Sequence, residues 1–259
     1  MKGERVTACV SSSFCLMKIE LLPGERIDDL QFHNLHIIQN ENAFRFGMDS
    51  VLLADFAFPR PKERVMDLGT GSGILPLLMY MREPNARYHG IEIDEDALNR
   101  ALRSLQLNSI DNDRITLQYG DIRKIGANFP ANSMDLVVCN PPYHVAPGGK
   151  VNHGVARMEE MCSLKDVAYA ARYLLINRGR FCMVYPAVRL QEVCITLAEM
   201  GLAIKRIRFI HHQVHKKPKL MLVEAYMGGR IGEVQVMEPL IIQENGENSA
   251  EIKRIYHQE

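Results

Sequence analysis

Between residue 64 and about residue 201, the chain alternates strictly between strand-like and helix-like segments, and this alternation limits its possible folds more than any other feature. Two strand-like segments contain near-continuous apolar runs, LVVC and FCMVY, as expected for parallel strands covered by helices on both faces. The pattern therefore predicts the α/β class, with a doubly wound, mostly parallel sheet. The expected strands are Arg64–Leu68, Ala86–Ile93, Arg114–Tyr119, Met134–Asn140 and Gly179–Tyr185, and the expected helices are Leu75–Arg82, Glu95–Leu107, Leu164–Ile176 and Val188–Met200.

The segment before this alternation, residues 17–62, is richer in β-forming residues. Leu30–Phe46 contains two short strand-like runs separated by the turn-prone residues 40–42. Asp49 is expected to cap a short apolar helix over Ser50–Phe58. These features predict a cover over the main sheet rather than a separate domain.

The segment after the alternation contains two strand-like runs, Ala203–Ile210 and Lys219–Met227, with no helix between them. They predict an antiparallel hairpin at the edge of the sheet. We interpret the chain as a single domain with two tails. The boundaries are a disordered tail at 1–16, a domain at 17–241 with its cover at 17–62, and a polar C-terminal tail at 242–259 that frays.

The composition excludes several classes of protein. Lys and Arg total 31, as do Asp and Glu, so a nucleic-acid site has to come from local clustering of charge rather than from net charge. The six cysteines contain no Cys-x-x-Cys pair, which favours reduced thiols in the cytoplasm over disulfides or zinc. No apolar run reaches the roughly 20 residues of a membrane span. We therefore expect a cytoplasmic protein without a bound metal.

The first predicted strand ends in a glycine-rich loop, Asp67-Leu68-Gly69-Thr70-Gly71-Ser72-Gly73, directly before a helix. Glycines at alternate positions let a ligand lie against bare backbone at the carboxyl edge of the sheet. A dinucleotide-binding loop would read G-x-G-x-x-G, whereas here the third glycine comes one residue early. The spacing favours a nucleoside ligand without phosphates, and the plain alternative is an ordinary strand-to-helix turn.

Carboxylates follow the next two strands. Glu92 stands between two isoleucines, 19 residues after Gly73, which is close to the spacing of an acid that accepts the hydroxyls of a bound ribose. Asp94 is better explained as the N-cap of the following helix. Asp121 follows the third strand and could accept from an adenine amino group, although a Gly-Asp turn explains it equally well.

The fourth strand ends in Asn140-Pro141-Pro142-Tyr143. The two prolines stop the strand and hold the preceding residue outside the helical region. The segment offers a side-chain acceptor on Asn140, a main-chain acceptor on Pro141 and a ring face on Tyr143. Two acceptors and a stacking surface are what is needed to hold a planar exocyclic amine and to release its lone pair.

Taken together, these motifs resemble those of class I S-adenosylmethionine-dependent methyltransferases that modify amino groups. Further segments are similar to the tRNA1(Val) (adenine(37)-N6)-methyltransferase family, namely Phe44–Ala54 (FRFGMDSVLLA), Ala156–Glu159 (ARME), Pro218–Leu220 and Leu222–Ala225. Two positions depart from the family pattern. Met48 stands where the family has Thr and Met158 where it has His, so no hydroxyl or imidazole role is carried over to them.

The resemblance implies a Rossmann-like class I methyltransferase fold with a seven-stranded sheet, and S-adenosyl-L-methionine as cofactor. It implies methylation of adenine N6 in RNA, in particular in tRNA next to the anticodon. The amine would attack the methyl group in line and lose its proton afterwards, so no general base is needed first. The implied cofactor residues are Asp49 and Ser50 at the methionine end, with Asp67, Gly69, Thr70, Gly71, Gly73, Glu92, Ile93, Asp121, Ile122 and Asn140, and the implied catalytic residues are Asn140, Pro141, Pro142 and Tyr143.

Basic residues cluster between Gly201 and Val223, a stretch without any acidic residue. In a chain of zero net charge, such a cluster is typical of a surface that follows RNA phosphates. An edge hairpin protected from aggregation by its lysines is an equally good explanation. The candidate RNA-binding residues are Lys205, Arg206, Arg208, Lys216, Lys217 and Lys219.

Two other functions remain open at this stage. A protein glutamine-N5 methyltransferase would use the same Asn-Pro-Pro-Tyr segment to hold a side-chain amide, but the 66 residues before Asp67 are short and β-rich for the helical substrate domain of that group. A non-catalytic scaffold that binds S-adenosylmethionine or RNA would not need the Asn140–Tyr143 segment, which is intact. A DNA adenine methyltransferase would need a further target-reading domain.

Overall fold

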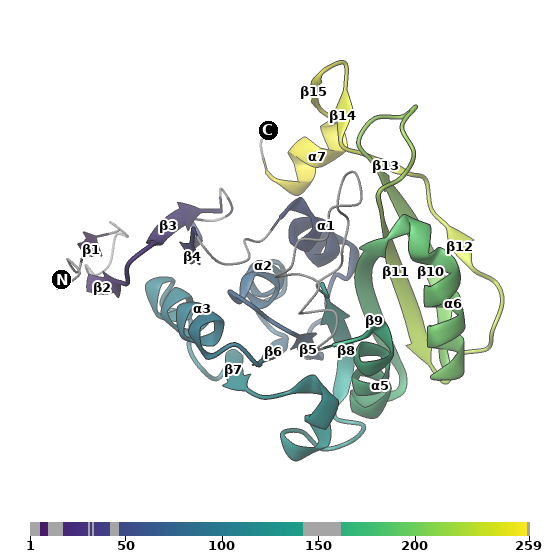
Figure 1. Cartoon of the computed structure of the whole chain (residues 1–259), viewed down its shortest axis with the longest axis horizontal. Coiled ribbons are helices and arrows are strands. Elements are labelled where there is room, and N and C mark those ends of the chain that lie inside the picture. The colour runs from purple at the N-terminus through teal and green to yellow at the C-terminus, as the bar shows by residue number, and fades with distance from the viewer. Residues whose placement is uncertain are drawn as a thin grey trace.

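The computed structural model describes residues 6–9, 18–30, 32, 34–41, 47–141 and 162–257. Its centre is a nine-stranded sheet in the order β12-β10-β11-β9-β8-β5-β6-β7, with β13 also paired to β10 (Figure 1). The strands are β5 (Arg64–Leu68), β6 (Arg87–Glu92), β7 (Ile115–Tyr119), β8 (Met134–Cys139), β9 (Leu175–Pro186), β10 (Leu202–His211), β11 (Leu220–Met227), β12 (Gln235–Val236) and β13 (Leu240–Ile241).

The strands β5 to β9 pair in parallel, and β11 and β10 then follow in antiparallel orientation. These seven strands confirm the predicted doubly wound fold and its hairpin. The hairpin differs from the prediction in one respect: β10 is not a bare edge. The two-residue strands β12 and β13 pair with it in parallel, and strands this short leave no recognisable alternation in the sequence.

Helices cover both faces of the sheet (Figure 1). One face carries α1 (Met48–Phe56), α2 (Ile74–Arg82) and α3 (Glu95–Leu107), and the other carries α5 (Leu164–Leu174) and α6 (Leu190–Glu199). Short 3-10 helices, η1 (Ile122–Ala127) and η2 (Ala187–Arg189), join other elements, and α7 (Ala250–Ile255) follows the last strands. Helix α1 begins after Gly47, with Asp49 in its first turn, so Asp49 is not the cap that the sequence suggested.

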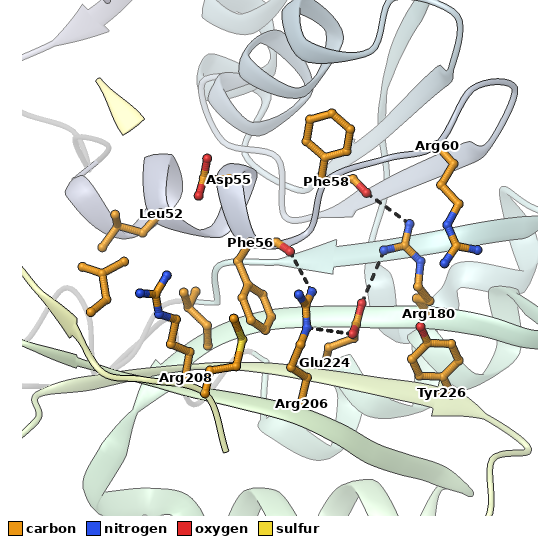
Figure 2. A pocket seen from close by; sticks show the side chains of 13 residues that line it. Leu52, Asp55, Phe56, Phe58, Arg60, Arg180, Arg206, Arg208, Glu224 and Tyr226 are labelled. Atoms are coloured by element: carbon orange, nitrogen blue, oxygen red, sulfur yellow. Dashed lines mark hydrogen bonds and ion pairs between the residues drawn. The ribbon is translucent and has the colours of Figure 1, made fainter. Parts of the chain in front are cut away.

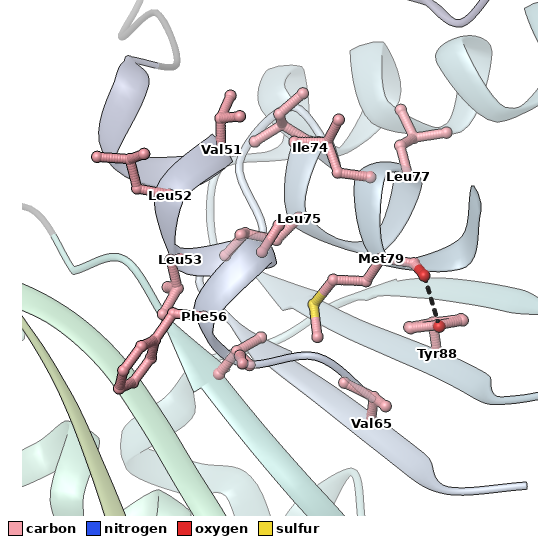
Figure 3. Packing of buried hydrophobic residues seen from close by; sticks show 14 of the residues in the cluster. Val51, Leu52, Leu53, Phe56, Val65, Ile74, Leu75, Leu77, Met79 and Tyr88 are labelled. Carbon is pink, nitrogen blue, oxygen red and sulfur yellow. Dashed lines mark hydrogen bonds between the residues drawn. The ribbon is translucent and has the colours of Figure 1, made fainter. Parts of the chain in front are cut away.

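The core has one apolar cluster on each face of the sheet. Along β8, Leu136 and Val138 join the cluster under α1 and α2, whereas Val137 and Cys139 join the cluster under α5. All four are at most 1% exposed, as alternating residues of a strand covered on both faces should be. Figure 3 shows the first cluster, in which α1 and α2 pack against each other over the strands.

The N-terminal segment contains two antiparallel pairs, β1 (Val6–Cys9) with β2 (Lys18–Leu21), and β3 (Glu25–Asp29) with β4 (His36–Asn40). The sequence placed both strands of one hairpin inside residues 30–46; the structure instead pairs β4 with the upstream β3. Strand β4 rests on α3, where the Ile38 amide donates to the Ser104 hydroxyl at 3.0 Å. Residues 42–46 lie outside the described residues.

The C-terminal segment was expected to fray, but the structure folds residues 243–255. Two short strands, β14 (Gln243–Glu244) and β15 (Glu247–Asn248), precede α7. Ile252 and Ile255 are 0% and 1% exposed, because their i,i+3 spacing turns both toward the core below α1. The Ser249 hydroxyl caps the helix by accepting from the Ile252 amide at 3.2 Å. Burial of these two isoleucines holds the helix against the core, although most of the segment is polar.

Two further features concern the whole described chain. Its helices are all too short or too polar to cross a bilayer. Within the same residues, no group of His, Cys, Asp and Glu side chains is arranged to hold a metal ion.

Candidate active site

The glycine loop lies between β5 and α2, and its backbone requires glycine. Gly69, Gly71 and Gly73 have φ of 72°, 55° and 80°, in the left-handed region that other residues rarely adopt. A Cβ on Gly69 or Gly71 would meet no atom within 4 Å, so the loop borders open space at these residues. A Cβ on Gly73 would lie 3.2 Å from the Cβ of Ala101, so this glycine allows α3 to pack closely instead.

Glu92 ends β6 directly beside this loop. Its side chain is nearly buried, at 8% exposure. One carboxylate oxygen accepts from the Gly71 amide at 2.8 Å, and the other accepts from the amides of Ile93 and Asp94, both at 2.9 Å. The predicted ribose acid therefore touches the predicted glycine loop, and each oxygen still has acceptor capacity. Asp94 caps α3, as its sequence position suggested.

Asp67 provides a buried carboxylate below the loop. It is 2% exposed, and its Oδ1 has no hydrogen-bond partner within the described part of the chain. Burial, helped by the neighbouring Glu92 charge and opposed by the Thr70 hydroxyl, raises the pKa of Asp67 to about 7. An orphaned buried oxygen is costly unless a donor satisfies it. This atom is therefore suited to a cationic or N–H donor of a bound ligand.

The end of β7 is less clearly a ligand site. Asp121 follows the strand at the same edge as Glu92, but its carboxylate binds the Arg123 guanidinium at 2.6 Å and caps η1 through the Arg123 amide at 2.9 Å. The hydrogen bond from Arg123 lowers the pKa of Asp121. Ile122 is half-buried against the second core cluster, whereas Ile93 beside Glu92 is 40% exposed and offers an open apolar face.

Asn140 stands at the end of β8, next to the glycine loop. Strands β8 and β5 are neighbours, and the Cys139 thiol donates to the Leu68 carbonyl at 3.2 Å. The half-buried Asn140 amide donates from Nδ2 to the hydroxyl of Ser50 at 2.9 Å. Because Ser50 is only 2% exposed, this bond holds the amide in one orientation and leaves its oxygen as an acceptor.

The remaining residues of the motif are described only in part. Pro141 is buried directly after Asn140. Pro142 and Tyr143 lie outside the described residues, as does Met158. The structure thus brings Asp67, the glycine loop, Glu92, Ser50 and Asn140 to one edge of the sheet, with Asp121 on the flank.

The predicted basic cluster is divided by the structure. Arg206 pairs with Glu224 at 3.0 Å, Arg208 pairs with Glu251 at 2.6 Å, and Lys205 Nζ donates to the Gly232 carbonyl at 2.8 Å. These acids lie outside the acid-free stretch, so the sequence count could not anticipate them. The exposed residues Lys216, Lys217 and Lys219 follow β10 in the turn that leads to β11. Because β11 begins opposite Pro186, this turn lies at the same sheet edge as the site.

Sequence reasoning also missed two charged residues within apolar strands. Arg180 and Glu224 are each 5% exposed and form an ion pair at 3.3 Å between β9 and β11. For Glu224 a signal was available, because a charge inside the apolar run LMLVEAYM is not explained by exposure to solvent.

Comparisons with known proteins show which family the chain belongs to. A family described as "Methyltransferase domain" matches residues 59–251. A tRNA1(Val) (adenine(37)-N6)-methyltransferase from Porphyromonas gingivalis is 33% identical over 207 residues, which cover 76% of this chain and 80% of that protein. The chain belongs to this methyltransferase family. A relative of the same name from Phocaeicola vulgatus is 30% identical, over 74% of this chain and 81% of its own.

Solved structures support the fold. A protein from Agrobacterium tumefaciens described as a "predicted O-methyltransferase" superposes with a TM-score of 0.68 at 21% identity, covering 81% of this chain and 96% of its own. The protein is a class I methyltransferase, and S-adenosyl-L-methionine is its cofactor. The open glycine loop and the orphaned Asp67 oxygen fit such a cofactor, which carries ribose hydroxyls and an ammonium group but no phosphate.

Proposed function

We propose that this methyltransferase transfers a methyl group to N6 of an adenine in tRNA, next to the anticodon, in the cytoplasm. The observation that carries the proposal is the position of Asn140, beside the glycine loop and with its amide held by Ser50 at 2.9 Å. The acceptor and its position follow those for which the relatives from Porphyromonas gingivalis and Phocaeicola vulgatus are named.

The cofactor would be held by residues from two neighbouring strands. Glu92 accepts from the ribose hydroxyls, and Asp67 accepts from the ammonium group through its orphaned oxygen. Gly69 and Gly71 leave room for the ligand against bare backbone. S-adenosyl-L-methionine supplies an electrophilic methyl group, and the protein contributes the alignment.

The target amine would be held by the end of β8. The Asn140 side-chain oxygen and the Pro141 carbonyl each accept one N–H of the adenine amino group, which draws the nitrogen lone pair out of conjugation with the ring. Tyr143 would stack on the base, as in other enzymes that act on an extruded base. A positively charged product amine loses its proton readily, so these residues need no general base.

The RNA would be held in part by the lysines of the β10–β11 turn. Lys216, Lys217 and Lys219 are exposed at the sheet edge where Asn140 lies. Lysines at this place would contact phosphates next to the target nucleotide. Arg206 and Arg208 are engaged with Glu224 and Glu251, so their first role is to hold the fold.

The proposal is tested by offering the protein several acceptors at once. The protein is incubated with radiolabelled S-adenosyl-L-methionine and separate pools of tRNA, rRNA, DNA and protein from a strain lacking the gene. Digestion of the labelled pool should yield N6-methyladenosine from tRNA alone. Label recovered as N5-methylglutamine would favour the protein methyltransferase instead, and label in rRNA or DNA would overturn the tRNA assignment.

A further inference from the structure

A hollow lies on the same sheet face as α1, beside the strands β10 and β11 (Figure 2). It consists of two adjoining cavities of about 440 and 530 Å³, which share Arg206, Glu224 and Tyr226 along their common wall. We call this combined hollow the arginine groove. None of the residues proposed to hold the cofactor or the target base lines it, so it is distinct from the candidate active site.

The floor of the arginine groove holds two guanidinium groups around one carboxylate. Glu224 accepts from Arg180 at 3.3 Å and from Arg206 at 3.0 Å (Figure 2). Arg206 also lies over the Phe56 ring, 4.2 Å from its centroid. Such packing fixes the two arginines on the floor, because each is held by several partners rather than by solvent.

Arg180, on the floor of the groove, is largely buried and only partly hydrogen-bonded by the described residues. Its side chain is 7% exposed and pairs with Glu63 at 2.7 Å as well as with Glu224. Its Nε nevertheless has no hydrogen-bond partner within the described residues. A buried donor without a partner is unfavourable, so this guanidinium is not fully satisfied by the described residues around it. Figure 2 shows Arg60 and Tyr226 around this end of the groove.

The rim adds further positive charge. Arg60, whose side chain is 68% exposed, approaches Glu63 only to 4.0 Å. Arg178 and Arg230 are exposed, and no carboxylate of the described residues forms an ion pair with either of them. The other acid of the lining, Asp55, is neutralised from outside the groove by Arg82 at 2.7 Å and Arg254 at 3.3 Å. The groove therefore has an excess of cations in a chain whose net charge is zero.

We propose that the arginine groove binds the phosphate backbone of the RNA substrate, away from the nucleotide that is methylated. This inference rests on the proposed function, because it assumes an RNA substrate. Exposed guanidinium groups without carboxylate partners among the described residues, such as those of Arg178 and Arg230, are well suited to phosphate oxygens.

Helix α1 relates the groove to the active site. Its first turn carries Ser50, which binds Asn140, and its last residue, Phe56, lines the groove under Arg206. Six residues of α-helix span about 9 Å along the axis. An RNA strand with its target base at Asn140 could therefore reach the groove with phosphates that are several nucleotides away. The lysines of the β10–β11 turn would contact phosphates close to the target nucleotide, and the groove would contact phosphates farther along the strand.

The experiment compares two charge-matched double variants of the full chain. Arg178→Glu with Arg230→Glu reverses two rim charges that no carboxylate of the described residues neutralises. Lys165→Glu with Arg87→Glu makes the same change of net charge at exposed residues that do not line the groove. Binding of each protein to a tRNA transcript is measured over a series of salt concentrations, with binding of S-adenosyl-L-methionine as the check on folding.

The groove variant should bind tRNA about tenfold more weakly at low salt. Its plot of log K against log salt should be less steep than that of wild type, with the magnitude of the slope smaller by about 2, one for each lost phosphate contact. The control variant should keep the wild-type slope, and both should bind the cofactor normally. Equal slopes for wild type and the groove variant would overturn the groove assignment, as would an equal loss in the control. Methylation of tRNA by the wild type is scored separately, so failure of the proposed function is seen independently.

Discussion

The side-chain amide of Asn140 donates a 2.9 Å hydrogen bond to the hydroxyl of Ser50, joining the end of β8 to the first turn of α1. The bond connects two residues that are 90 positions apart in the chain. It fixes the orientation of the amide and leaves its oxygen free to accept a hydrogen bond from a substrate N–H. Ser50 is therefore a positioning residue for Asn140 in the proposed reaction.

Ser50→Ala should lower kcat about tenfold while leaving the affinity for S-adenosyl-L-methionine nearly unchanged, because the amide of Asn140 loses the acceptor that orients it. Ser50→Thr keeps a hydroxyl at this position and should restore most of the rate. Steady-state kinetics with tRNA and calorimetric binding of the cofactor separate the two parameters. A weaker cofactor affinity with unchanged kcat would place Ser50 at the methionine end of the cofactor instead.

Glu92→Ala should weaken binding of S-adenosyl-L-methionine by at least about tenfold, because the ribose hydroxyls lose a charged acceptor and the loop amide of Gly71 loses its partner. Isothermal titration calorimetry measures the affinity. Glu95→Ala, at an exposed position at the start of α3, is the matched control and should bind normally. Wild-type affinity in the Glu92 variant would remove the ribose assignment.

The pKa of Asp67, raised by burial to about 7 from 3.8, predicts a pH dependence of stability in the protein without cofactor. Between about pH 4 and pH 7, the folded state keeps a proton that the unfolded chain has already released. The free energy of unfolding should therefore fall as the pH rises through this range, by up to about 1.4 kcal/mol per pH unit, and level off above it.

Asp67→Asn cannot ionise and should remove this contribution, so the variant gains stability relative to wild type as the pH approaches 7. Urea unfolding at a series of pH values measures the difference. Asp113→Asn, in an exposed turn, controls for the chemical change. A constant difference between the Asp67 variant and wild type from pH 4 to pH 7 would show that Asp67 is not the titrating group.

Glu224→Ala should destabilise the protein by about 3–5 kcal/mol, because the guanidinium groups of Arg180 and Arg206 lose the carboxylate between them. Urea unfolding gives the free energy. The exposed Glu233→Ala is the control and should change stability by less than about 0.5 kcal/mol. A loss as small as that of the control would mean that the two arginines are adequately paired without Glu224.

Local sequence signals were sufficient for most of the fold and for part of the site. The glycine triplet after β5 needs a backbone that only glycine adopts, and the acid at the end of β6 stands where solvent cannot explain it, so both were recognisable. Contacts between residues that are far apart in the sequence could not be recognised in this way. The sequence did not show that Arg206 and Arg208 form ion pairs with Glu224 and Glu251, because these two acids lie outside the window in which the charges were counted.

For Asp121, the sequence predicted the position but not the partner. Its position at the sheet edge was predicted correctly by its place after β7, but the fork that it forms with Arg123 depends on how the chain turns into η1. The C-terminal helix was missed because two buried isoleucines are a weak signal in a polar segment. For Asp121 and for the two isoleucines, the sequence shows the residues but does not show which other residues they contact.

In the proposed reaction, the Asn140 oxygen holds the amine that is methylated. Single-turnover transfer of labelled methyl to tRNA by wild type and by Asn140→Ala, with cofactor binding measured on the same samples, tests this role. We expect N6-methyladenosine from wild type and a transfer rate about 100-fold lower in the variant, with nearly unchanged cofactor affinity. Transfer at the wild-type rate in Asn140→Ala would contradict it, as would a loss of cofactor binding that accounts for the whole decrease in rate.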